Sequence, residues 1–236
     1  MSDAVKSWGI FSTFAFGAIA LIVSQLSGIV AVSELYGLDL KQIGTISRDG
    51  GGIILFICVS APIQVVLLVA AASYKSNPAT YLGYKLPRRG EVLFGIGALA
   101  ALILTGDLIS LLAGRSVVDP FQSDIYQAAQ KANLFPLLLF AICILIPVSE
   151  ESLFRGFLFR GWLRSPLNAW LVIVLTAGLF AVIHVQYDWF LIGQVFAFGV
   201  LFGWMRWVTG STLLTMLLHG LVNLEGMIET LLSAGS

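Results

Sequence analysis

Seven long apolar segments dominate the chain, and they decide its fold class before any other feature. A membrane-spanning helix needs about 20 mostly apolar residues, and each segment has that length. Only 11% of the residues are charged, whereas a soluble domain carries about 25%. The sequence therefore predicts an all-α, polytopic transmembrane helical bundle of about seven to eight spans. The expected spans lie near residues 8–32, 50–74, 91–114, 134–159, 166–187, 189–208 and 211–233.

The basic residues indicate how such a bundle is oriented. In a seven-span layout, one side collects Lys6, Lys75, Lys85, Arg88, Arg89, Arg155, Arg160, Arg164 and Arg206. The other side has Lys41, Arg48, Arg115 and Lys131. Because cytoplasmic loops carry the excess of Lys and Arg, we expect a cytoplasmic amino terminus. We also expect a multi-pass protein of a prokaryotic plasma membrane. The first apolar run is too long for the core of a signal peptide, so we interpret it as a span.

Two polar stretches separate the apolar segments and divide the chain. The first, "SYKSNPATYLGYKLPRRG" (73–90), is a basic loop before the third segment. The stretch "GRSVVDPFQSDIYQAAQKAN" precedes the fourth segment, and its "FQSDIYQAA" part predicts a short interfacial helix. We place a boundary there, with residues 1–124 as a supporting half of about three spans and 125–236 as a catalytic half of about four. Cys58 and Cys143 lie inside apolar runs and are interpreted as small core residues.

Polar side chains are concentrated in the second half, where the bilayer makes them costly. A charged group at the membrane centre costs about 2.5–3.5 kcal/mol and is kept when it is paired or used. The group consists of Glu150, Glu151, His184, His219, Asn223, Glu225 and Glu229, and it includes both histidines of the chain. Interfacial charge and interhelical hydrogen bonds are simpler explanations for single members. Three successive polar-bearing helices favour a shared pocket.

Helical spacing predicts how the two adjacent glutamates are used. On a helix Glu150 and Glu151 point about 100° apart. Glu151 and Arg155 are four residues apart and can form an ion pair on one face, which leaves Glu150 as the freer carboxylate. Pro147, three residues before Glu150, removes a backbone hydrogen bond and is expected to kink the helix.

The same reasoning applies to the two later helices. Phe180 and His184 are four residues apart, so the aromatic ring can brace the imidazole, and His219 and Asn223 also share a face. Glu225 follows His219 by six residues, about 240° around the helix, so we expect it to face elsewhere, where it pairs with another helix or lines a substrate path. Asp107 is expected to cap a kink or to pair with a neighbouring helix, since no second element supports an aspartyl pair.

Three motifs, in order on the fourth, fifth and seventh apolar segments, resemble those of one protease family. The stretch "EESLFRG" (150–156) looks like the E-E-x-x-x-R motif of the CAAX-protease and bacteriocin-processing intramembrane proteases. That family includes the Ras-converting CAAX endopeptidases and the bacterial Abi-type proteins. "FAVIH" (180–184) matches its F-x-x-x-H motif, and "HGLVN" (219–223) its H-x-x-x-N/D motif. The resemblance covers roughly residues 125–230.

The resemblance implies an intramembrane peptidase and assigns roles to the matching residues. Glu150 would be the catalytic glutamate, and His184 would help it hold the attacking water. His219 and Asn223 would stabilise the oxyanion, which is consistent with their capacity to donate hydrogen bonds. The accessory residues would be Glu151, Arg155 and Phe180. The implied substrate is a membrane-associated peptide or lipidated protein, either of CAAX type or an exported peptide, and no nucleic acid is expected.

A zinc version of the site stays open, because the family is often described as metalloproteases. Glu150, His184 and His219 would make a zinc triad with an open fourth position, and Glu151 could act as base. The usual H-E-x-x-H signature is absent, and we favour the version without a metal. Two other classes of function also remain as alternatives. One is a small proton-coupled transporter, since acidic and His groups mark ion paths; the other is a non-catalytic scaffold or immunity protein.

Overall fold

The described part of the chain, residues 6–37 and 49–234, is built from helices without a strand in a computed structural model. Five helices are long and apolar enough to cross a membrane: α1 (Ile10–Tyr36), α2 (Gly50–Ser73), α4 (Arg89–Leu112), the composite helix Phe135–Trp162 and α10 (Trp189–Thr209). The all-α membrane fold is confirmed. The expected count of seven to eight spans is not, because α9 (Ala169–Val182) has only 14 residues and α11 (Thr212–Ala234) is not among the five.

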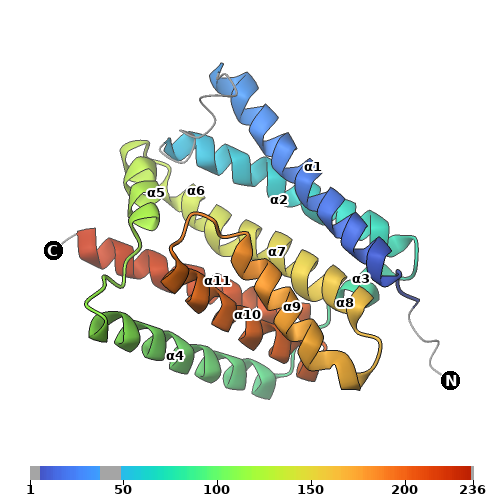
Figure 1. Cartoon of the computed structure of the whole chain (residues 1–236). Helices are drawn as coiled ribbons and strands as arrows, with labels where there is room; N and C mark the ends of the chain where they lie inside the picture. Colours follow the sequence, from blue (N-terminus) through green and yellow to red (C-terminus); the bar gives the residue numbers. More distant parts are fainter. Residues whose placement is uncertain (1–5, 38–48, 235–236) are drawn as a thin grey trace.

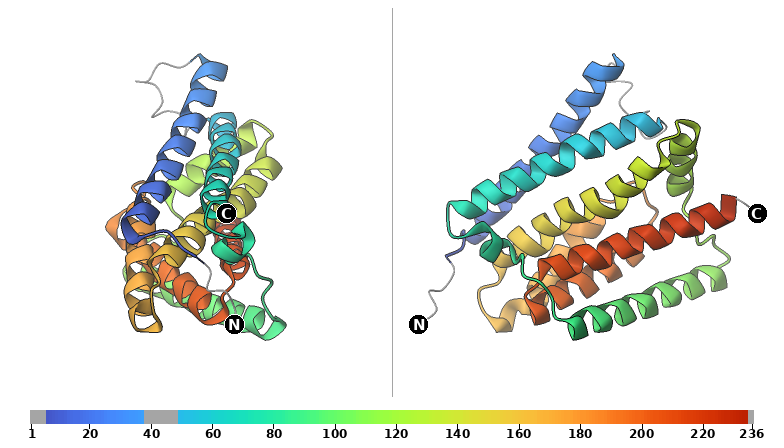
Figure 2. Two further views of the ribbon diagram at one scale, coloured as in Figure 1. Left: turned by 90° about the vertical axis from the view of Figure 1, so that its right-hand side faces the viewer. Right: turned by 180° about the vertical axis from the view of Figure 1, so that it is seen from behind.

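The helices run in alternating directions, so their connections gather at two ends of the bundle (Figure 1). The composite helix lies between α2 and α11, and α4 lies on the far side of α11. Helices α9 and α10 pack together and cover one face of this row, as the view from behind shows (Figure 2). Helix α1 begins at one end of the bundle, and α11 (Thr212–Ala234) ends at the other. We call the end that holds α3 (Pro78–Leu82) the α3 end, and the end that holds α5 (Pro120–Lys131) the α5 end.

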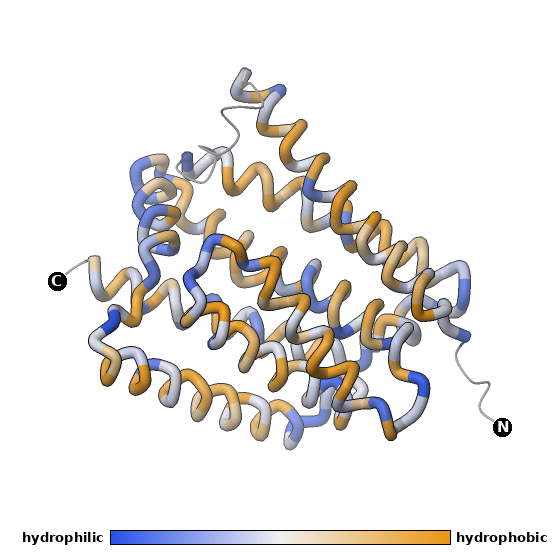
Figure 3. The backbone as a smooth tube through the Cα atoms, viewed as in Figure 1, coloured by the Kyte–Doolittle hydropathy of each residue, from blue (hydrophilic) through white to orange (hydrophobic). Residues whose placement is uncertain are grey.

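Helix α5 is the short polar helix that the sequence predicts before the fourth span. Figure 3 shows it as one of the most hydrophilic segments among orange, apolar helices. It begins at an N-cap, Asp119, whose carboxylate accepts hydrogen bonds from the backbone N–H groups of Phe121 and Gln122. It packs against α2 and α11 at the α5 end of the bundle.

The composite helix is continuous, but two of its stretches have π-helical geometry. It consists of α6 (Phe135–Phe140), η2 (Ala141–Leu145), α7 (Ile146–Glu151), η3 (Ser152–Leu158) and α8 (Phe159–Trp162). The sequence predicts that this helix ends at residue 159, three residues before its observed end at Trp162. The chain accommodates the proline through a π segment immediately before it, and such bulges are frequent at functional sites.

The proline also explains an interhelical contact of the π segment η2. The N–H of Ile146 bonds to the carbonyl of Ala141, and Pro147 has no N–H to offer the next carbonyl, that of Ile142. The side-chain amide of Asn223 donates to that carbonyl at 2.8 Å. Two further carbonyls of the composite helix accept from other helices, Ser149 from Gln64 at 3.0 Å and Arg155 from Arg206 at 3.0 Å.

Helix α9 is shorter than the segment 166–187 that the sequence predicts. It is preceded by the 3₁₀ turn η4 (Pro166–Asn168) and ends at Val182. The chain then turns, with the N–H of Tyr187 bonded to the carbonyl of His184, until Asp188 caps the start of α10. His184 therefore lies in the connection between α9 and α10 and not on a helical face, because Asp188 competes for the chain as a strong N-cap.

Candidate active site

A cavity of about 960 Å³ lies inside the bundle and opens among α2, α4, the composite helix, α10 and α11. Its walls include the four residues that the sequence singles out for catalysis: Glu150, His184, His219 and Asn223. Three different parts of the chain supply them, namely the composite helix, the α9–α10 connection and α11. Residues from all three motifs thus line one cavity in the fold.

The two adjacent glutamates have opposite environments. The Glu150 side chain is 21% exposed and lines the cavity, with its Oε2 atom 3.9 Å from Nε2 of His219. Glu151 is completely buried and faces away from the cavity, toward Arg155. The Nη1 group of Arg155 donates to Oε1 of Glu151 at 2.9 Å, which confirms the predicted ion pair. Glu150 is consequently the carboxylate that a substrate can reach.

Arg155 holds this ion pair inside the bundle. Its side chain is fully buried, and its second amino group donates to the carbonyl of Gly199 on α10 at 3.1 Å. The guanidinium carbon also lies 4.5 Å from the ring centre of Phe180, within the range of a cation–π interaction. A side chain at position 199 would meet the arginine, because a Cβ there would lie 3.3 Å from Nη2. Glycine at this position therefore lets α10 approach the charge pair.

The imidazole of His219 is fixed on both its edge and its face. Its Nδ1 atom lies 3.1 Å from Oε1 of Glu151. Since a carboxylate only accepts hydrogen bonds, Nδ1 carries the proton of that contact. The ring stacks on Phe202, with centroids 5.7 Å apart, and meets Phe180 edge-on at 5.6 Å. These contacts direct Nε2 toward Glu150.

His184 presents the same atom to the cavity by a different device. Its Nδ1 lies 2.7 Å from the carbonyl of Phe180, which places the proton on Nδ1 and leaves Nε2 with a free lone pair. The ring of Phe180 meets the imidazole edge-on at 4.8 Å, so the predicted aromatic brace is confirmed. Phe180 contacts both histidines and the arginine, and it is thereby the common packing partner of the site.

Tyr187 is a member of the site that the sequence reasoning missed. Its ring stacks on His184 at 5.8 Å and meets Phe121 of α5 edge-on at 6.5 Å. Its side chain lines the same cavity as the four predicted residues. An aromatic residue three positions after a candidate histidine was the only signal for it in the sequence.

Asn223 faces the cavity with part of its hydrogen-bonding capacity already used. One of its two amide hydrogens goes to the carbonyl of Ile142, and the other remains for a ligand. Helix α11 can come this close because residue 220 is glycine. A Cβ at Gly220 would lie 2.5 Å from the carbonyl oxygen of Cys143, too close for any side chain.

A second group of carboxylates lines the same cavity. Asp107, Glu225 and Glu229 each offer an oxygen within 4.8 Å of the others. Glu225 lies on a different face of α11 from His219, as its spacing predicts, and the cavity is wide enough to include both faces. Among the described residues, this is the one trio of possible metal ligands with atoms that close together. Glu150, His184 and His219 do not form such a trio as they are placed.

Comparison with known proteins relates this geometry to one family. Residues 132–224 match the family described as type II CAAX prenyl endopeptidase Rce1-like. The chain is 32% identical over 132 residues to an uncharacterized 24.3 kDa protein of Escherichia coli, a match that covers 52% of this chain and 57% of the relative. No solved structure matches significantly. All seven predicted site residues lie within the matched segment. Residues 132–224 are thus similar to the type II CAAX prenyl endopeptidase Rce1-like family, a family of membrane proteases.

Proposed function

We propose that the protein is an intramembrane endopeptidase that hydrolyses a peptide bond of a membrane-associated substrate with a water molecule activated by Glu150. The observation that carries the proposal is the position of Glu150 on the cavity wall, 3.9 Å from Nε2 of His219. His184 offers a free Nε2 to the same cavity. A carboxylate and two imidazoles around a space that admits a peptide are the groups that water-mediated hydrolysis requires.

The reaction follows from the groups on the cavity wall. Water held between Glu150 and Nε2 of His184 gives a proton to the carboxylate as its oxygen bonds to the carbonyl carbon. The electron pair of the carbonyl moves to its oxygen, and Asn223 donates its remaining amide hydrogen to this oxyanion. His219, when its ring carries two protons between Glu150 and Glu151, donates from Nε2. The oxyanion then collapses, the C–N bond breaks, and Glu150 returns its proton to the leaving amine.

The buried pair behind the cavity supports His219 in this role. Glu151 holds Nδ1 of His219, and Arg155 neutralises Glu151 from the other side. A carboxylate that orients an imidazole and stabilises its charged form is a recurrent arrangement in hydrolases. Arg155 and Glu151 therefore act as positioning residues, without contact to the substrate.

The proposed mechanism uses no metal. Zinc bound by Glu150, His184 and His219 would supply the activated water instead, but the ligand atoms of these residues do not converge as placed. Both imidazoles do have Nδ1 engaged by an oxygen, a pattern shared with zinc-ligating histidines. Proteolysis should therefore be measured with and without a chelator, alongside the metal content of the purified protein. Activity of the metal-free protein supports the glutamate mechanism, and activity restored only by zinc contradicts it.

The central test replaces Glu150 by glutamine, which keeps the shape and removes the base. We expect Glu150→Gln to lower the cleavage rate of a membrane-anchored reporter by about 10²–10⁴-fold while the protein still purifies as a folded bundle. Glu34→Gln, which changes an exposed carboxylate at the end of α1, is the matched control and should leave the rate unchanged. Full activity of Glu150→Gln would exclude the proposal. A scaffold would show no cleavage with either protein.

A further inference from the structure

The cavity reaches only one end of the bundle. Several of its lining residues belong to connections at the α5 end: Val117, Asp119, Gln186 and Tyr187. Among the described residues, those that line it include none from the connections at the α3 end, such as 74–88, 163–168 or 210–211. A substrate therefore approaches the proposed site from the α5 end.

The short helix α9 explains why the bundle is open there. Its 14 residues rise only ~21 Å, against ~30 Å for the hydrocarbon core of a bilayer. Because α9 starts level with its neighbours at the α3 end (Figure 1), the shortfall lies at the α5 end. The connection 183–188 fills this gap as a loop, and loops at membrane depth occur where they line a cavity that holds water.

The α3 end is closed by a plug of buried residues. Tyr81 and Leu82 of α3 are completely buried, and Tyr81 packs on Phe157 of the composite helix with ring centroids 5.5 Å apart. The Thr212 hydroxyl at the start of α11 donates to the carbonyl of Leu82 at 2.6 Å. The Ser211 hydroxyl donates to the carbonyl of Lys85 at 2.6 Å as well. These bonds join α3 and the loop after it to the start of α11, and none of the residues in this plug lines the cavity.

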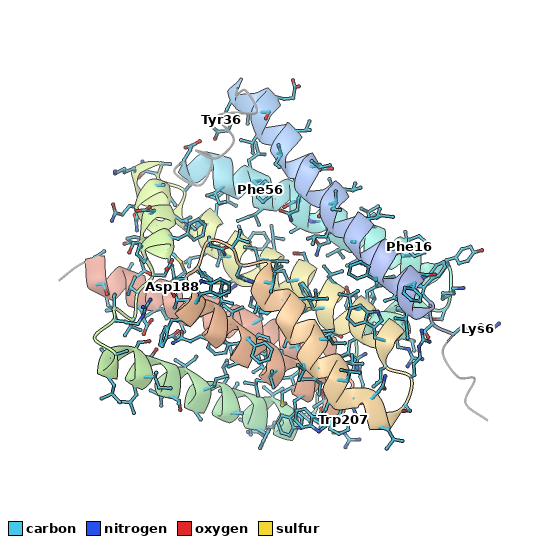
Figure 4. All side chains as sticks on the ribbon, in the orientation of Figure 1. Lys6, Phe16, Tyr36, Phe56, Asp188 and Trp207 are labelled. Carbon is cyan, nitrogen blue, oxygen red and sulfur yellow. The ribbon has the colours of Figure 1, made fainter. Side chains whose placement is uncertain are left out.

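The basic residues gather at the closed end. Eight of the 13 lysines and arginines lie in its connections or within about one helical turn of them: Lys6, Lys75, Lys85, Arg88, Arg89, Arg160, Arg164 and Arg206. Arg155 is buried in the bundle, and the remaining described basic residues, Arg115 and Lys131, lie at the α5 end. Figure 4 labels Lys6 at the α3 end and Asp188 toward the α5 end.

The lining of the cavity has the opposite charge. Five carboxylates line it, and none of the described lining residues is a lysine or arginine. The five are Asp107, Asp119, Glu150, Glu225 and Glu229. Lysine and arginine are enriched on the cytoplasmic side of membrane proteins, so both charge distributions favour a cytoplasmic α3 end.

We infer that the cavity opens to the non-cytoplasmic side of the membrane, and that its substrates are peptide segments already inserted into the membrane or exported across it. The substrate class rests on the proposed function, whereas the orientation of the cavity does not. This inference separates the protein from a protease that trims cytoplasmic, carboxyl-terminal CAAX sequences, because such a sequence would meet the closed end. The reactions that supply the substrate are therefore membrane insertion or export of a polypeptide.

The orientation can be tested by labelling two matched positions on either side of α9. Leu167 is 98% exposed in the connection at the α3 end, and Val185 is 84% exposed in the connection at the α5 end. The background carries Cys58→Ala and Cys143→Ala, which remove the two free thiols. We expect a membrane-impermeant maleimide to label Val185→Cys on intact cells and Leu167→Cys only after the membrane is opened. The inference is overturned if Val185→Cys is not labelled on intact cells, or if Leu167→Cys is labelled on intact cells.

A second arm tests the substrate class. Two reporters carry the same cleavable segment beside a single membrane anchor, on the non-cytoplasmic side in one and on the cytoplasmic side in the other. We expect cleavage of the first alone, and its loss in Glu150→Gln. Cleavage of the cytoplasmic reporter overturns the inference. Labelling needs no proteolytic activity. If the labelling is as expected but neither reporter is cleaved, the result counts against the proposed protease and not against the orientation.

Discussion

Two groups of charged side chains lie inside this bundle, and the fold treats them in opposite ways. In the first, Glu151, Arg155 and His219 are buried and connected by contacts of 2.9 and 3.1 Å. We call this the paired group. In the second, the carboxylates of Asp107, Glu225 and Glu229 crowd within 4.8 Å of one another on the cavity wall. We call this the acidic wall.

The difference shows under which conditions a charged side chain is retained inside a membrane protein. A charge away from water is retained when a partner compensates it, and the paired group meets this condition without touching the cavity. The acidic wall has no basic neighbour among the described residues that line the cavity, and it depends on the water that the cavity admits. Glu150 lies between the two, close to His219 and open to the cavity, which is the position that a reactive group needs.

The largest expected effect breaks the paired group. Arg155→Met leaves Glu151 as an uncompensated buried charge, so we expect the free energy of unfolding to fall by about 3–5 kcal/mol. Unfolding in detergent micelles, followed by loss of helical circular dichroism, measures the change. Arg89→Met, at an exposed position at the start of α4, is the control and should change stability little.

The double variant sharpens this test. If the loss arises from the orphaned carboxylate, Glu151→Gln combined with Arg155→Met should be more stable than Arg155→Met alone. A double variant that loses the sum of the two single effects would mean that the residues act independently, which contradicts the network.

Local spacing in the sequence was sufficient to predict much of this arrangement. The predicted contact of Phe180 with His184 forms at the turn after α9. The pair Glu151–Arg155 and the freer position of Glu150 follow from helical geometry over four residues or fewer. These predictions hold because a helix fixes neighbours one turn apart whatever surrounds it. The positions of most long helices also follow from hydropathy alone.

Features that depend on other helices could not be predicted in the same way. The π segment before Pro147 is stabilised in part by Asn223, 81 residues away, which supplies the donor for the carbonyl of Ile142. The early end of α9 depends on the cap of the next helix, Asp188. Glu225 joins the cavity because the cavity is wider than one helical face, and hydropathy carries no information on that width.

A medium effect tests the closeness of α11 to the composite helix, on which the paired group depends. Gly220→Ala places a methyl group against the carbonyl of Cys143, because a Cβ added at this position would lie only 2.5 Å from the carbonyl oxygen. Overpacking of this kind costs about 1–3 kcal/mol, and it should also lengthen the contact of Asn223 with Ile142 and reduce cleavage. Gly97→Ala, with no atom within 4 Å of the added carbon, is the matched control in α4. Equal behaviour of the two variants would argue that α11 does not sit as close as described.

The smallest expected effect has the opposite sign and concerns the acidic wall. Glu225 and Glu229 are four residues apart on α11, and like charges at this spacing destabilise a helix by about 0.2–0.5 kcal/mol. Glu229→Gln keeps the side-chain shape and removes one charge, so it should raise the free energy of unfolding by that amount. Glu225→Gln should do the same, and the double variant should gain little more, because the first replacement already removes the repulsion. A loss of stability above 1 kcal/mol in either single variant would contradict a net repulsion between the two carboxylates.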